Sequence, residues 1–406
     1  MVLALAAGGG AAGLAADGRI STPAGWGRIE RQRASTSALP LSPLAAACRS
    51  NEPLARRLRR APAVCLAAGA AAAASAGAAA KAKAGKRRVR RQHIELGNMT
   101  PVRDVPFLIP RPPYLEPGNP TKPEQGFPKH EWLYSEKRKT RIQIKGPGEI
   151  EAMRKAGALA REALALAGSL VYPGGTTEAI DAAVHDFICA RGAYPSPLGY
   201  MGYAKSVCTS VNDVIAHGIP DDRILEQGDI INVDVTVFLD GHHGDTSSMF
   251  FVGRPKRSAY ELCEAALRAR DAGIAVCGPG VDFREVGKAI DKVREEAGCH
   301  CSGWLRGHGI GSYFHGSPVI VPTTNDLDQG LMQPGMTFTV EPVLVENNDD
   351  TWEMLEDGWT LRTETAAWSA QFEHTVLITD TGHELLTGPT IDYKAVSAAA
   401  AKKASS

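Results

Sequence analysis

The sequence from Gly228 to Ser248, GDIINVDVTVFLDGHHGDTSS, predicts a β-hairpin. Apolar and polar residues alternate along its first half, which is the two-residue period of a strand. The dipeptide Asp240-Gly241 is a strong signal for a tight turn. With the turn there, Thr236 faces Asp245, and Asp234 lies diagonal to Asp245 on the same face of the sheet. Diagonal neighbours are about 7–8 Å apart, so the two carboxylates can share a metal site.

The alternative interpretation is that both acids only flank the turn. Asp234 counts against it, because it interrupts an Ile/Val run inside a strand, where Asp is depleted. A slip of one residue in the pairing would also send the two acids to opposite faces. The register of the hairpin therefore decides between the two interpretations.

The charge of the chain is unevenly distributed. The whole sequence of 406 residues carries 45 basic and 45 acidic residues, but residues 1–92 have 16 Lys and Arg against three acids. The rest of the chain therefore has a net charge of −13, which disfavours nucleic-acid binding by the globular part. The Ala-, Gly- and Arg-rich composition of residues 1–92 predicts a disordered organellar transit peptide, for a chloroplast or mitochondrion.

Two stretches of this leader admit other interpretations. Ala61–Ala80 is an uncharged run long enough for a membrane span, but it is mostly Ala and Gly, so we expect no stable span. Val2–Ala16 is also compatible with the apolar core of a signal peptide. The Cys residues beyond the leader form no disulfide framework and no CxxC pair, which indicates reduced thiols.

Composition divides the remaining chain into three parts. Nine prolines lie between Pro101 and Pro128, which excludes a regular helix there and predicts an extended, proline-rich arm over 93–147. A globular domain is expected over 148–390. The last segment, 391–406, is expected to be a disordered tail.

Within the globular domain, helical periodicity occurs twice, each time as a pair. One pair comprises a long helix over 150–167 and, after Pro173-Gly174, a second helix to Ile188. The other pair opens at Ser258, in a Ser-x-x-Glu capping box, and at Asp282. Strands follow each pair, so the order predicts a pseudo-symmetric α/β (α+β) domain with a site between its halves.

The second half offers three further candidate ligands. His308 lies among glycines in GHGIG, where the backbone can approach closely. Glu341, in MTFTVEPVLV, and Glu373, in SAQFEHTVLIT, are acids placed in strand-like patterns. Four carboxylates and one imidazole suit two divalent ions such as Mn²⁺, Fe²⁺ or Co²⁺ rather than one structural zinc.

These motifs together resemble the type I methionine aminopeptidases. The resemblance rests on six stretches between about residues 145 and 388, namely LGYMGYAKSVCTSVNDVIAHGIPDD, the hairpin with its continuation MFFVG, GHGIGSYFHGSP, QPGMTFTVEPVL, DGWTLRT and SAQFEHTVLIT. It implies the pita-bread fold, a pseudo-two-fold repeat of a helix pair plus antiparallel sheet with a dinuclear metal site between the halves. The short interval between Glu341 and Glu373 leaves no room for the helical insertion of the type II enzymes.

The resemblance also implies a role for each site residue. The implied ligands of two ions (Co²⁺, Mn²⁺, Fe²⁺ or Zn²⁺) are Asp234, Asp245, His308, Glu341 and Glu373. Asp245 and Glu373 would bridge the ions, and Glu341 would also shuttle protons. His217 would stabilise the tetrahedral intermediate, and His315 would contact the substrate backbone. The implied pocket for the methionine side chain consists of Tyr200, Tyr203, Cys208, Phe314 and Trp359, with His217 and His315 beside it.

The implied activity is removal of the initiator methionine from nascent chains whose second residue is small, by a monomeric enzyme. An Xaa-Pro aminopeptidase or prolidase of the same fold is the first alternative, but residues 93–147 are too short and too rich in proline for the N-terminal domain of such enzymes. A catalytically inactive binding protein is the second, and the presence of all five ligands disfavours it. The arm would either dock on the enzyme or reach toward the organellar ribosome.

Overall fold

The computed structural model describes residues 92–122, 125–126, 128–132 and 142–404. The expected transit peptide, including Ala61–Ala80, therefore lies outside the described residues except for its last position. Within the described part of the chain, none of the helices is long and apolar enough to cross a membrane. The cysteines there are free thiols, as the sequence indicated.

The predicted hairpin forms the centre of the domain. Its strands are β4 (Ile230–Leu239) and β5 (His242–Phe251), joined by Asp240-Gly241. Both turn residues have positive φ angles, 51° and 79°, as a two-residue hairpin turn of type I′ requires. Thr236 pairs with Asp245, so the predicted register is confirmed.

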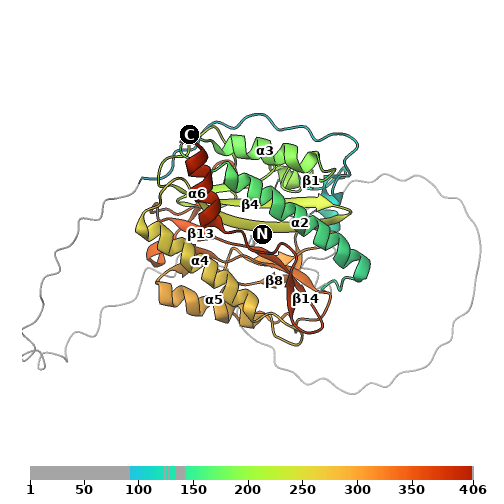
Figure 1. Cartoon of the computed structure of the whole chain (residues 1–406). Helices are drawn as coiled ribbons and strands as arrows, with labels where there is room; N and C mark the ends of the chain where they lie inside the picture. The colour runs from blue at the N-terminus through green and yellow to red at the C-terminus, as the bar shows by residue number, and fades with distance from the viewer. Residues whose placement is uncertain (1–91, 123–124, 127, 133–141, 405–406) are drawn as a thin grey trace, which may run out of the picture. The chain divides into compact units, whose positions relative to one another are not determined.

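The two predicted helix pairs are present. The first is α2 (Pro147–Ser169) with α3 (Thr177–Cys189), and the second is α4 (Arg257–Ala275) with α5 (Arg284–Ala297). In the view of Figure 1 the first pair lies toward the top of the domain and the second toward the bottom. The capping box at Ser258 was wrong, because α4 begins one residue earlier and has no side-chain cap.

In the described part of the chain the strands form four sheets, and every pairing between these strands is antiparallel. The first half contributes β1 (Tyr194–Pro195), β2 (Cys208–Val211) and β3 (Val214–Ala216) besides the hairpin. The second half contributes β6 (His300–Cys301), β7 (Gly307–Gly309), β8 (Gly316–Ile320), β9 (Thr337–Val340), β10 (Val343–Val345), β11 (Glu353–Met354), β12 (Leu361–Arg362), β13 (Ser369–Gln371), β14 (His374–Ile378) and β15 (His383–Leu385). The sheet orders are β1-β4-β2 with β5 on β4, β13-β10-β6, β11-β12-β3, and β15-β14-β9-β7-β8. The expected repeat of a helix pair plus antiparallel sheet is therefore observed.

Helix α2 packs so closely on the hairpin that a side chain would not fit between them. A Cβ on Gly244 of β5 would lie 2.5 Å from the backbone nitrogen of Gly157 in α2. Along the edge that faces away from β4, β5 meets the second half, where the Thr375 hydroxyl donates to the Asp245 carbonyl at 2.8 Å. The hairpin is thus held between α2 and the second sheet, which fixes where its acids point.

The proline-rich arm docks on the first half. The Arg103 guanidinium lies 2.6 Å from Glu178 of α3, and Lys205 lies 2.6 Å from the same carboxylate. Further along, a short 3₁₀ helix, η2 (Pro113–Leu115), presents Tyr114, whose hydroxyl donates to the Ser196 carbonyl. The arm continues to α1 (Lys129–Trp132).

The expectation of a disordered tail over 391–406 is wrong. Residues Tyr393–Ala404 form helix α6, which lies against β5 and α2 (Figure 1). The Ser397 hydroxyl accepts a hydrogen bond of 2.9 Å from the Phe251 backbone N–H at the end of β5. Tyr393 is buried among Phe251 and Phe372, so the helix completes the core rather than trailing from it.

Candidate metal centre and active site

The hairpin supplies the first two acids of the site. Asp234 lies opposite Ser247 and Asp245 opposite Thr236, so the two acids are diagonal neighbours on one face. The Thr236 hydroxyl donates to Asp245 Oδ1 at 2.6 Å. Cys208 of β2 pairs directly with Asp234 on the other edge of β4.

His308 enters from β7 of the second half. Its backbone N–H donates to the Thr339 hydroxyl at 2.9 Å, and its Nδ1 lies 3.2 Å from the Gly309 carbonyl. If Nδ1 carries the proton, Nε2 presents its lone pair toward the acids, which is the arrangement of a metal-binding histidine. A Cβ on Gly309 would collide with the Ser317 carbonyl, so glycine here permits the close pairing that places His308.

Glu341 and Glu373 lie just outside strands, where the sequence patterns placed them inside. Glu341 follows β9 and precedes Pro342, which cannot donate to a ladder, so pairing ends there. Glu373 lies between β13 and β14, where the chain passes from one sheet to another. Its backbone N–H donates to the Ser247 carbonyl at 3.1 Å, which ties it to the hairpin.

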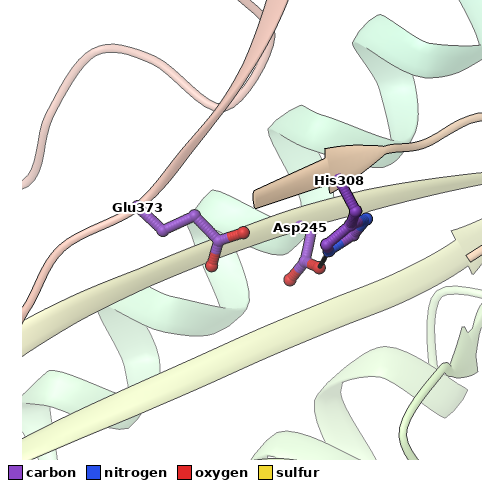
Figure 2. Close-up of side chains that lie close together, drawn as sticks. All are labelled: Asp245, His308 and Glu373. Atoms are coloured by element: carbon purple, nitrogen blue, oxygen red, sulfur yellow. Dashed lines mark ion pairs between the residues drawn. The ribbon is translucent and has the colours of Figure 1, made fainter. Parts of the chain in front are cut away.

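The donors of both halves converge. Atoms of Asp245, His308 and Glu373 lie within 4.8 Å of one another, and Figure 2 shows the three side chains together in the space between the strands. His308 Nε2 is 3.6 Å from both Asp245 Oδ2 and Glu341 Oε1. Asp234 and Glu341 flank this group of three.

The chemistry of these donors fits divalent cations. Burial raises the pKa of Asp234 well above its usual value, and the neighbouring carboxylates of Asp245 and Glu341 raise it further. Burial and the same kind of repulsion raise the pKa of Glu373. Asp234 Oδ1 is buried and has no hydrogen-bond partner. A cluster of buried acids with an unsatisfied oxygen and an imidazole nitrogen is a site that cations of charge +2 would neutralise.

Two further histidines reach the same space. His217 has a positive φ of 57°, uncommon for a residue other than glycine and typical of strained functional sites. Burial lowers its pKa to about 3 and lowers that of His315 well below the usual value, so both rings are neutral near pH 7. The Nδ1 atom of each ring is buried without a hydrogen-bond partner.

Four of the five predicted pocket residues form an aromatic wall, and Cys208 packs against it. The Tyr203 and Trp359 rings are 5.1 Å apart at their centroids, and the Tyr200 and Phe314 rings are 4.9 Å apart. The Tyr203 hydroxyl donates to backbone carbonyls, which fixes its ring. Burial raises the pKa of the Cys208 thiol well above its usual value, so the pocket presents a neutral sulfur among rings. Such a surface suits a flexible thioether.

All twelve predicted site residues line one cavity. They are Tyr200, Tyr203, Cys208, His217, Asp234, Asp245, His308, Phe314, His315, Glu341, Trp359 and Glu373. Sequence reasoning missed other lining residues, including Asn232, Arg306 and Gln371. Gln371 donates to Glu341 Oε2 at 3.2 Å, and only its place two residues before Glu373 could have suggested it.

An antiparallel two-half fold around a cavity of acids and imidazoles defines a metallopeptidase. Residues 151–380 match the model of metallopeptidase family M24. Methionine aminopeptidase 1D, chloroplastic/mitochondrial, of Arabidopsis thaliana is 46% identical over 303 residues, covering 73% of this chain and 80% of the relative. The human methionine aminopeptidase 1D, mitochondrial, is 48% identical over 246 residues, covering 61% of this chain and 73% of the relative.

A solved structure gives the same result. The crystal structure of methionine aminopeptidase from Rickettsia prowazekii aligns with a TM-score of 0.60 and 40% identity, over 61% of this chain and all of that one. The chain therefore belongs to metallopeptidase family M24 and, within it, to the type I methionine aminopeptidases. The prolidase alternative is less supported, because these relatives carry the name methionine aminopeptidase. The organellar names of the relatives agree with the localisation expected from the leader.

Proposed function

We propose that this chain removes the N-terminal methionine from nascent polypeptides with a small second residue, in a chloroplast or mitochondrion. The observation that supports the proposal is that the five predicted metal ligands, two neutral histidines and the aromatic wall line the same cavity. Buried acids alone, or aromatic rings alone, also occur in protein cores that bind no substrate. A thioether pocket beside a cation site is what hydrolysis of a Met-initiated peptide bond needs.

We assign Asp234, Asp245, His308, Glu341 and Glu373 as the residues that would hold two divalent cations. Divalent cations bound there would polarise the scissile carbonyl and make water a stronger nucleophile at neutral pH. Other residues of the cavity position the substrate beside the metal ligands. The aromatic wall takes the methionine side chain and excludes water from it, which positions the first peptide bond beside the acids.

The remaining steps belong to side chains of the protein. The Glu341 carboxylate takes a proton from the attacking water and delivers it to the amino group of the leaving peptide. The Thr339 hydroxyl donates to Glu341 Oε1 at 2.7 Å, which orients that carboxylate. We assign His217 to the tetrahedral intermediate and His315 to the substrate backbone, since both neutral rings line the cavity.

Peptide hydrolysis by the full chain tests this assignment. With Mn²⁺, or with Fe²⁺ under anaerobic conditions, we expect free methionine from Met-Ala-Ser and no cleavage of an Ala-Pro peptide. Replacing Ala at the second position of the substrate by Leu should suppress release. Asp234→Asn should abolish release and lower the bound metal measured by elemental analysis. Cleavage of the Ala-Pro peptide instead would support the prolidase alternative, and a silent wild-type protein would support a binding function.

Localisation has a separate test. Residues 1–92 fused to a fluorescent reporter should direct the reporter into mitochondria or chloroplasts. A reporter that stays in the cytosol would contradict the organellar part of the proposal. It would leave the peptidase assignment standing, because release of methionine by the purified chain does not depend on where the protein is delivered.

A further inference from the structure

One acid of the arm is buried against the methionine pocket. Glu131, in α1, is 0% exposed, although it precedes the segment 151–380 that matches the family model. Its Oε2 accepts a hydrogen bond of 2.5 Å from the Tyr200 hydroxyl, and its Oε1 accepts one of 2.8 Å from the Phe314 backbone N–H. Both partners are residues of the aromatic wall.

The two partners come from different halves of the fold. Tyr200 lies in the connection between β1 and β2, and Phe314 lies in the connection between β7 and β8. Their rings meet at 4.9 Å, and the next residue after Phe314 is His315, whose ring is 4.9 Å from that of Tyr200. One carboxylate therefore joins the walls of the pocket at the point where the halves meet.

A second arm residue supports the same place. The Tyr114 ring packs edge-on against the Tyr200 ring at 4.9 Å and lies 6.4 Å from the Phe314 ring. Tyr114 also belongs to the buried apolar cluster that contains Tyr203 and Trp359. The arm thus covers the outer side of the pocket, with Glu131 as its polar contact.

A buried acid such as Glu131 is not needed merely to anchor the arm. Burial raises the pKa of Glu131 to about 7, which shows that its environment is costly for a charge. The arm is already anchored elsewhere by the ion pair between Arg103 and Glu178. An acid buried at a cost, with both oxygens directed at pocket residues, indicates a role in the pocket.

We propose that Glu131 is a positioning residue that sets the shape of the methionine pocket by holding the Tyr200 hydroxyl and the Phe314 backbone together. The inference rests on the proposed function, since it concerns the substrate of that site. Glu131 itself touches no metal donor among the contacts described, so it acts through Tyr200 and Phe314 rather than on the reacting atoms.

Steady-state kinetics of the full chain test this role. Glu131→Ala removes both hydrogen bonds, and we expect KM for Met-Ala-Ser to rise about tenfold or more, with a smaller change in kcat. The preference for Met-Ala-Ser over Leu-Ala-Ser should fall. Glu131→Gln keeps the shape and the acceptor for Phe314, so it should restore much of the loss. Glu116→Ala, an exposed acid of the same arm, is the matched control and should change neither constant.

A double-mutant cycle covers the case in which Glu131→Ala does not fold. Tyr200→Phe removes only the hydroxyl, so Glu131→Gln and Tyr200→Phe should have non-additive effects on KM. Additive effects, or a lower melting temperature with unchanged KM and substrate preference, would overturn the inference and leave Glu131 as an anchor of the arm. A wild-type chain that releases no methionine would instead refute the proposed function.

Discussion

The Thr236 hydroxyl donates a 2.6 Å hydrogen bond to Asp245 Oδ1 across the hairpin. Asp245 is also 3.6 Å from His308, through its other oxygen, Oδ2. One oxygen is therefore fixed by the neighbouring strand, and the other is directed at the group of donors. The orientation of the acid therefore depends on the Thr236 hydroxyl.

Thr236→Val should weaken metal binding without unfolding the hairpin. Valine has nearly the same shape, but it leaves Asp245 Oδ1 without its donor and frees the carboxylate to rotate. Loss of such a supporting hydrogen bond typically reduces metal affinity by about 10–100-fold. Titration calorimetry with Mn²⁺ measures the change. Thr236→Ser keeps the hydroxyl and is the control, and equal affinity in all three proteins would contradict this account.

Glu373→Gln should stabilise the metal-free protein while it abolishes activity. Burial raises the pKa of Glu373, and repulsion from Asp245, Glu341 and Asp234 raises it further, so its charge is unfavourable without cations. A neutral amide of the same size removes that repulsion. We expect the melting temperature in EDTA to rise by a few degrees, as about 1 kcal/mol corresponds to roughly 2–4 °C in a domain of this size.

The matched control for that prediction is Glu296→Gln, which changes an exposed acid of α5. It should alter neither the melting temperature in EDTA nor methionine release. With Mn²⁺ present, wild type should have the higher melting temperature, because it gains more stability from bound cations than Glu373→Gln does. If Glu373→Gln melted at a lower temperature than wild type in EDTA, repulsion among the buried acids would not destabilise the metal-free protein.

The hairpin and its two acids could be predicted from local sequence patterns. Asp240-Gly241 fixes the turn, the turn fixes the register, and the register places Asp234 and Asp245 on one face. The placement of His308 and Glu373 beside them depended on the resemblance, since no local pattern states which strands of the two halves meet. The strand boundaries near Glu341 and Glu373 were missed, because pairing ends where the chain changes sheets.

Two parts escaped prediction for a different physical reason. Glu131 lies far along the chain from Phe314, and a lone acid in a proline-rich segment gives no sign of burial. The C-terminal segment resembles a low-complexity tail, since its apolar content is mostly alanine. Only Tyr393, Ser397 and Ala400, at helical spacing, mark the buried face of α6. In both cases tertiary contacts decide the structure.

Lys145→Met should stabilise the protein most at low pH. Burial lowers the pKa of Lys145 from 10.5 to about 7 in the folded protein. Between these values the unfolded chain binds more protons, so the stability of wild type rises with pH. Below pH 7 both states are protonated, and the folded state bears the full cost of a buried charge. The advantage of Lys145→Met should therefore be largest below pH 7 and shrink toward pH 10.

Urea unfolding of wild type and Lys145→Met over this pH range measures the difference in the free energy of unfolding. The titrations of the acidic cluster are common to both proteins and cancel in the difference. Lys292→Met, an exposed lysine of α5, should show no such trend. A constant difference across the range would mean that Lys145 keeps an ordinary pKa, with its amine solvated despite the contact of 3.3 Å to the Tyr313 hydroxyl.

Helix α6 should be a cooperative part of the fold, and Tyr393 is the residue that tests it. Its ring is 5.2 Å from that of Phe251 and 5.1 Å from that of Phe372, and its hydroxyl donates to Glu264 at 2.5 Å. Tyr393→Ala leaves a large cavity between α6 and the sheet. Truncation of a buried aromatic residue costs about 3–5 kcal/mol, so we expect a loss of that size in the free energy of unfolding.

Tyr393→Phe separates the ring from the hydroxyl and should cost only about 1 kcal/mol, the net value of a hydrogen bond. Lys402→Ala, on the exposed side of α6, should be neutral. Hydrogen exchange adds a direct measure, because the backbone N–H of Phe251, which donates to Ser397, should be protected in wild type and exposed in a chain that ends at residue 391. If the Phe251 N–H were equally protected in the full and the shortened chain, and Tyr393→Ala were as stable as wild type, α6 would not be part of the cooperative fold. The core formed by β5 would then have to be closed by α2 alone, although β5 contacts both helices.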